Sequence, residues 1–252
     1  MADRAYTHIT RSEAVVGNAG AERRFMLFPG HTLSLRQVIA GRGYIEWIER
    51  PVPDWELDLL GGGHAAFPAV PEWSEACDDT GATLWAEWNT PELVVRTWCM
   101  AFHRIPVLAR GITVHLRKVT FQCGALGMAV ERLALRRDGA GILDDRLTCR
   151  MEYGAWTGRR AASELKGGGG VGLLLGTDTE GRFELFHPDP ALVRISFYPG
   201  TGPADPQGAQ QYVLIVPYVG SPVAAAAMLE EAIRLLRARM DACHLLDREA
   251  PA

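Results

Sequence analysis

Seven tryptophans are the side chains best suited to forming a binding surface, and all of them lie between positions 47 and 156. A large aromatic ring often fills a hydrophobic core, but it also lines pockets for flat or apolar ligands and anchors peptide interfaces. Four of them are candidate ligand contacts: Trp73, Trp85, Trp88 and Trp98. Trp73 is the least core-like of these, because it stands in a segment rich in proline and acidic residues. Burial of all four in the core remains the alternative.

An arginine on the apolar side of a helix is the second candidate. At about 100° per residue, Arg239 falls near the middle of the apolar face that we predict for the helix at 221–246. A guanidinium does not lose its proton, so a buried one needs an anionic or strongly polar partner. Arg239 is therefore expected to anchor a ligand carboxylate or phosphate, to pair with an acid of the sheet, or to reach the surface.

A metal site is a weaker hypothesis. Cys99 and His103 stand four residues apart on a segment predicted to be helical, a spacing that presents two ligands to one metal. His64 lies in the longest early loop, close in sequence to Cys77 and several acids. The alternative is that these are ordinary surface histidines and core thiols.

Established cofactor and catalytic motifs are missing from the sequence. There is no HExxH, no GxxxxGK[ST] and no GxSxG. The stretch Gly167–Gly170 lacks the preceding strand and following helix of a dinucleotide site, so we expect no cofactor. The carboxylates Asp54, Glu56 and Asp58 alternate with apolar residues. They form either a solvated strand face or part of a general acid–base pair.

Composition narrows the class of protein. The chain has 252 residues and a formal charge of −4, which argues against a general nucleic-acid binder. Five widely spaced cysteines are typical of reduced thiols, and we predict a cytoplasmic location. The N-terminus has no apolar signal core, and no stretch approaches the ~20 apolar residues of a membrane span. A strong excess of arginine over lysine favours a bacterial origin.

The elements that carry these residues predict an α+β fold. Ser221 and Pro222 are good helix-starting residues, and the segment that follows is rich in strong helix formers. A second, internal helix is expected over 90–104, and most of the rest alternates as strands. We therefore expect a curved, largely antiparallel sheet with one internal helix and a long C-terminal helix packed across it.

The same pattern predicts one domain over 1–252, with a loosely ordered lead-in at 1–22 and a flexible glycine-rich loop at 159–181. In outline this arrangement is similar to helix-grip, ligand-binding folds, without any residue-level match.

The leading functional hypothesis is a binding protein that holds a small apolar or aromatic molecule, or a peptide segment, in a partly aromatic pocket between sheet and helix. Such a protein fits an accessory role in a biosynthetic pathway. One alternative is an enzyme of the same architecture, either cyclase-like with acid–base carboxylates or metal-dependent. Another is an interaction module that forms a homo-oligomer or joins a partner subunit. No membrane or nucleic-acid partner is expected.

Overall fold

A computed structural model describes most of the chain. The described residues are 4–39, 41, 43–58, 64–65, 70–91, 93–116, 128–134, 142–143, 150–151, 154–164, 170–185, 192–197 and 211–249.

The first part of the chain forms a small antiparallel sheet. Its strands follow each other in chain order: β1 (Tyr6–Ile9), β2 (Glu13–Gly17), β3 (Ala21–Met26), β4 (His31–Ile39) and β5 (Gly43–Glu46), with β6 (Val52–Pro53) paired to β4. The predicted loose lead-in at 1–22 is therefore wrong in its described part. Ala14 and Val16 are fully buried, and this burial holds β2 in the sheet.

The remaining described strands form one larger, antiparallel sheet. Its main path runs through β8 (His64–Ala65), β7 (Glu56–Asp58), β13 (Met128–Ala134), β18 (Leu192–Phe197), β17 (Val171–Leu185), β19 (Gln211–Val219), β12 (Leu108–Leu116), β11 (Leu93–Phe102), β10 (Gly81–Asn89) and β9 (Glu72–Cys77). Off this path, β16 (Gly154–Glu164) pairs with β17, and β14 (Ile142–Leu143) pairs with β15 (Arg150–Met151) and β16.

The predicted internal helix at 90–104 is wrong, because residues 93–102 form strand β11. Val95 and Cys99 on one face of this strand and Met100 and Phe102 on the other are all buried. A strand that is covered on both faces is apolar throughout, so its sequence does not alternate and imitates a buried helix.

The predicted flexible loop at 159–181 is also largely wrong. Residues 160–164 of β16 pair with residues 172–176 of β17, while 165–169 lie outside the described residues. A Cβ on Gly176 would lie 2.4 Å from a methyl carbon of Leu229, so this glycine lets the C-terminal helix approach the sheet closely. Gly176 therefore serves close packing between strand and helix.

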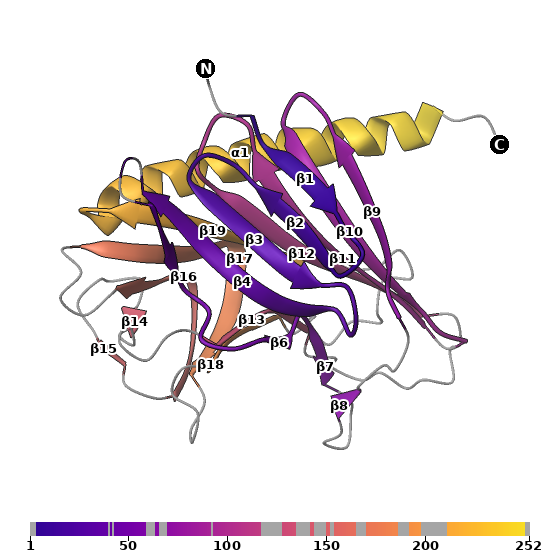
Figure 1. The fold of residues 1–252 in the computed structure, drawn as a ribbon, viewed down its shortest axis with the longest axis horizontal. Helices are drawn as coiled ribbons and strands as arrows, with labels where there is room; N and C mark the ends of the chain where they lie inside the picture. The colour runs from indigo at the N-terminus through magenta and orange to yellow at the C-terminus, as the bar shows by residue number, and fades with distance from the viewer. Residues whose placement is uncertain are drawn as a thin grey trace.

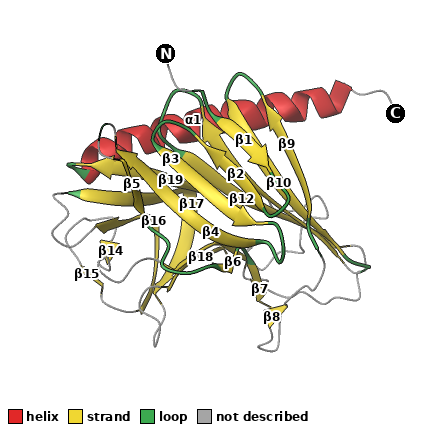
Figure 2. Ribbon diagram, in the orientation of Figure 1, coloured by secondary structure: helices red, strands yellow, loops and turns green. Residues whose placement is uncertain are grey.

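Three layers result, as Figures 1 and 2 show: the small sheet, the large sheet and the helix α1 (Pro222–Glu249). One hydrophobic cluster lies between the sheets and includes Phe25, Leu35 and Leu84. A second lies between the large sheet and α1 and includes Leu214 and Leu229. The predicted α+β class and the long terminal helix across an antiparallel sheet are confirmed, but the strands form two sheets.

Buried polar side chains lock the two sheets together. The amide of Asn18, in the β2–β3 turn, donates to the carbonyls of Phe102 and Ile105 at 3.1 and 3.0 Å. Gln37 on β4 donates to the carbonyl of Tyr218 on β19 at 2.9 Å.

In the part of the chain that the structure describes, no helix has the length and apolar character of a membrane-spanning segment.

Candidate functional site

The most unusual group of side chains is a buried ionic cluster between the two sheets. Arg23 comes from β3, Arg110 from β12, and Asp54 follows β6, so both sheets contribute to it. All three residues are at most 2% exposed. Burying charge is costly unless the charges are paired and hydrogen-bonded, so the contacts of Asp54 decide whether this cluster is stable.

Asp54 accepts four hydrogen bonds. Its Oδ1 accepts from Arg23 at 3.3 Å and from Thr32 at 3.1 Å. Its Oδ2 accepts from the Nη2 of Arg110 and from Thr97 at 3.4 Å. Both carboxylate oxygens are thus occupied by protein donors. Asp54 was predicted to stand on a solvated strand face or in an acid–base pair, and the solvated placement is wrong.

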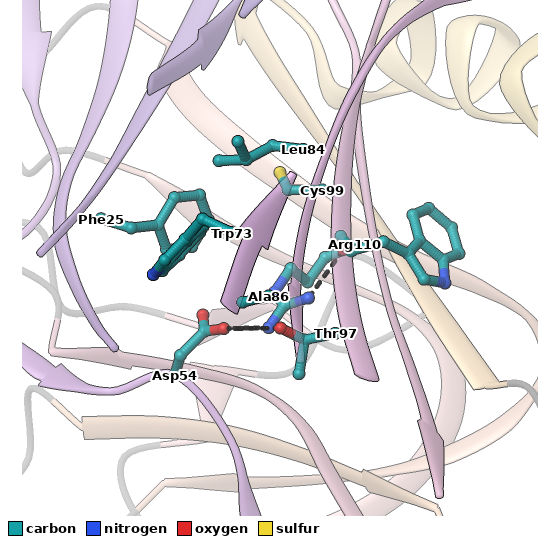
Figure 3. Close-up of a pocket in the computed structure, with 9 residues that line it drawn as sticks. Phe25, Asp54, Trp73, Leu84, Ala86, Thr97, Cys99 and Arg110 are labelled. Carbon is teal, nitrogen blue, oxygen red and sulfur yellow. Dashed lines mark hydrogen bonds and ion pairs between the residues drawn. The ribbon is translucent and has the colours of Figure 1, made fainter. Parts of the chain in front are cut away.

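A narrow pocket lies beside this cluster, and in this structure it is too tight to admit a water molecule. Its lining residues come from both sheets: Phe25, Asp54, Trp73, Leu84, Ala86, Thr97, Trp98, Cys99 and Arg110. Figure 3 shows Phe25 and Trp73 on one side of it and Arg110 on the other. Mostly apolar walls with a few fixed polar groups are typical of ligand sites, although those sites usually measure ~300–1,000 Å³.

Arg110 presents one free donor to this pocket. Its Nη1 donates to the carbonyls of Trp98 and Gly111 at 2.7 and 2.8 Å, and its Nη2 donates to Asp54. Its buried Nε–H has no acceptor among the described residues. Its guanidinium carbon also lies 5.9 Å from the centre of the Phe25 ring. A buried donor without a partner is rare in folded proteins and calls for an explanation.

Trp73 forms the wall of the pocket at the edge of the large sheet. It lies on β9, which ends the path of that sheet, and it is only partly buried. Its ring centre lies 5.6 Å from that of Phe25, and its Nε1 donates to the carbonyl of Leu27 at 3.1 Å. The indole therefore lies between the pocket and the surface, where it packs against the inter-sheet core and donates one hydrogen bond to Leu27.

The four candidate tryptophans do not form one pocket. Trp88 is 2% exposed and meets Trp55 edge-on between the sheets, with ring centres 5.3 Å apart. Trp85 and the indole of Trp98 pack in the cluster beneath α1. Of the four, Trp73 and Trp98 line the inter-sheet pocket, and Trp98 supplies to it the carbonyl that Arg110 binds.

Arg239 lies away from this pocket and has protein partners. Its side chain is 19% exposed, and it forms an ion pair with Asp78 at 2.7 Å. Its Nη1 donates to the hydroxyl of Thr83 at 3.0 Å and contacts the sulfur of Met100. Pairing of Arg239 with an acid of the sheet was one of the sequence-based alternatives, and Asp78 directly follows strand β9. The ligand-anchor role of Arg239 stays a prediction.

The predicted helical pair of Cys99 and His103 does not exist, because Cys99 lies on β11 and His103 follows that strand. The Nδ1 of His103 accepts from the backbone of Ala5 at 3.0 Å, so its Nε2 carries the proton and donates to the carbonyl of Asp78 at 2.7 Å. Cys77 lies 3.8 Å from that nitrogen, which has no lone pair to accept the thiol proton.

No metal cluster appears among the side chains that the structure describes: no three histidine, cysteine, aspartate or glutamate residues gather there. His64 lies on β8, and its side chain is outside the described part.

The outer face of the small sheet carries a row of charged and aromatic side chains. Glu22 accepts from the Tyr6 hydroxyl at 2.6 Å, from Arg24 at 2.8 Å and from Arg36 at 3.3 Å. Burial raises the pKa of the Glu22 carboxyl, but these donors outweigh it and hold the pKa below its ordinary value. The ring of Tyr44, which is 58% exposed, lies 4.4 Å from the Arg36 guanidinium.

The sequence itself contains a signal that Arg110 is buried. Along β12, Leu108, Arg110 and Ile112 share one face, and both apolar neighbours are fully buried. An arginine between two core positions of a strand must itself be buried. Arg110 was not among the residues singled out from the sequence.

Comparisons with known proteins identify the fold and no family. No family model matches the sequence, and no curated protein is similar to it at a significant level. The chain is similar to the GH36 alpha-galactosidase AgaB from Geobacillus stearothermophilus, with a TM-score of 0.53, 10% identity, and 86% of this chain and 41% of that chain covered. It is also similar to a GalM/aldose epimerase homologue from C. elegans, with a TM-score of 0.50, 8% identity, and 87% and 100% covered.

Other matching structures are longer than this chain. The chain spans 38% of the alpha-N-acetylgalactosaminidase NagBb from Bifidobacterium bifidum, with a TM-score of 0.53, 11% identity and 91% of this chain covered. It spans about half of two YidC chains, 46% and 58%, at TM-scores of 0.48 and 0.46. At such low identity, the likenesses with TM-scores of 0.50 and above show the fold alone.

Proposed function

We propose that this chain is a binding protein that holds a small organic molecule in the pocket between its two sheets. The observation that carries the proposal is the unsatisfied, buried Nε–H of Arg110 facing a pocket with aromatic walls. This is the combination expected from the sequence, a buried arginine beside tryptophan, but with Arg110 in the role first given to Arg239. The size of the pocket favours a small molecule over a peptide segment.

The small volume of the pocket sets a condition on binding. In this structure the pocket is too tight to admit even one water molecule. Any ligand therefore requires one wall to move, and Trp73 is the wall that lies at a sheet edge. We therefore propose that the ligand enters beside β9 as the Trp73 indole swings away from Phe25.

Native mass spectrometry after incubation with the small-molecule fraction of a bacterial extract tests this function. We expect the protein to retain a small organic mass that is lost on denaturation. Ala86→Leu fills the pocket and should abolish retention, because Ala86 is 1% exposed and lines it. Ala76→Leu adds the same atoms at an exposed position of β9 and serves as the matched control. Equal retention by both variants would place the ligand elsewhere.

A second candidate function is carbohydrate recognition on the outer face of the small sheet. Tyr44 is the observation that favours it, because an exposed aromatic ring beside the Arg36 guanidinium offers a stacking surface next to hydrogen-bond donors. The names of AgaB, NagBb and the aldose epimerase homologue are consistent with it. A glycan array probed with the protein and with Tyr44→Ala tests it: sugar binding that Tyr44→Ala leaves unchanged would contradict this site.

A further inference from the structure

The buried guanidinium of Arg110 also restricts the chemistry of the ligand. We propose that the inter-sheet pocket selects a short organic acid, whose carboxylate accepts the Nε–H of Arg110 while its apolar part lies against Phe25, Trp73 and Leu84. This inference rests on the proposed binding function and adds the class of ligand.

The guanidinium of Arg110 has one more buried donor than the described residues satisfy. An arginine stays charged in proteins and has five N–H donors in a fixed plane. The contacts of Nη1 and Nη2 go to two backbone carbonyls and to Asp54, which leaves Nε without an acceptor among the described residues. The residue is 1% exposed, so bulk water does not solvate that donor.

The protein's own acid does not satisfy this donor. Each oxygen of Asp54 already accepts two hydrogen bonds, from Arg23 and Thr32 on one side and from Arg110 and Thr97 on the other. A ligand oxygen at Nε therefore adds a bond that the cluster does not make by itself. An anionic acceptor gives a stronger bond to a guanidinium than a neutral one does.

The remaining walls decide the rest of the ligand. Opposite Arg110 lie Phe25 and Trp73, and Leu84 and Ala86 complete the apolar lining. Such a surface favours the binding of an aliphatic or flat group. It disfavours hydroxyl groups, because they would be buried without a hydrogen-bond partner. The pocket is too tight for an aliphatic or flat group unless Trp73 moves, and a short group requires the smallest movement. Short branched monocarboxylates meet all of these conditions.

Calorimetric titration of the intact protein with isobutyrate and with isobutyramide tests the inference, because the two probes share one shape and differ in charge. We expect isobutyrate to bind at least tenfold more tightly. Arg110→Lys keeps the charge but removes the Nε donor, and it should reduce isobutyrate binding at least tenfold. Arg234→Lys, at an exposed arginine of α1 that pairs with Glu231, should leave it unchanged.

The outcomes separate this inference from the function on which it rests. Equal affinity for both probes, blocked by Ala86→Leu, would overturn the organic-acid class and leave a binding pocket. Binding of neither probe would overturn the inference, while the retained mass in the native spectrum tests the function independently. If Arg110→Lys does not fold, the comparison of the two probes on the unmodified protein still decides.

Discussion

Replacing Asp54 by alanine tests whether the buried cluster holds the two sheets together. Asp54 is 2% exposed and is the carboxylate that Arg23 and Arg110 share. The alanine variant leaves two buried guanidinium groups without this partner. Removing one member of a buried ion pair costs about 3–5 kcal/mol, because the desolvated charge that remains is uncompensated. We therefore expect the free energy of unfolding to fall by about that amount.

Urea unfolding followed by tryptophan fluorescence measures this loss, with an unchanged m-value showing that the same surface is exposed on unfolding. Glu230→Ala is the control, because Glu230 pairs with Arg160 but is 58% exposed. Exposed pairs contribute roughly 0–1 kcal/mol. If Asp54→Ala costs no more than Glu230→Ala, the cluster does not stabilise the sandwich and our reasoning about it is refuted.

Three further changes test other parts of the fold. Asn18→Leu removes hydrogen bonds to three carbonyls where β11 connects to β12, and should lower the free energy of unfolding by about 1–3 kcal/mol; unchanged urea stability would contradict it. Gly111→Ala places a Cβ 2.2 Å from the Trp98 ring, and should cost about 1–3 kcal/mol and shift the tryptophan emission, whereas a neutral effect would show that the ring moves freely. The pKa of Glu22 is lower in the folded protein than its value of ~4.3 in the unfolded chain, so the ionised carboxyl stabilises the fold above pH ~4.3 and this stability is lost as the pH falls through the folded pKa. Glu22→Gln should therefore weaken the acid dependence of the unfolding free energy below pH ~5. Parallel stability curves for the two proteins would refute this.

The long helix was predictable because local chemistry decides it. Ser221 caps its start, with its hydroxyl accepting from the backbone of Val223 at 3.2 Å, and helix formers follow without interruption. Strand β11 was not predictable from the same rules. It is covered by the small sheet on one face and by α1 on the other, and this covering depends on contacts between residues far apart in the sequence.

The candidate site was only partly predictable for the same reason. Residue types suggested a buried arginine and a tryptophan, and Arg110 and Trp73 provide them. Trp73 and Arg110 are 37 positions apart in the chain. They line the same pocket because β9, β10, β11 and β12 pair side by side in the large sheet. The partner of Arg110, Asp54, comes from yet another part of the chain. Sequence periodicity finds the face of a residue within its strand but does not find its partner across the sandwich.

The rate at which iodoacetamide alkylates Cys99 in the native protein tests the central claim most directly. Cys99 is buried and lines the pocket, while Cys77 is exposed and gives an internal control in the same peptide-resolved mass spectrum. Our account predicts that Trp73→Ala accelerates alkylation of Cys99 at least tenfold without changing that of Cys77. Asn18→Leu destabilises the fold away from Trp73. At an equal loss of unfolding free energy, we expect it to accelerate the alkylation of Cys99 less than Trp73→Ala does. Equal acceleration by both variants, at the rate of global unfolding, would contradict a pocket that opens beside Trp73.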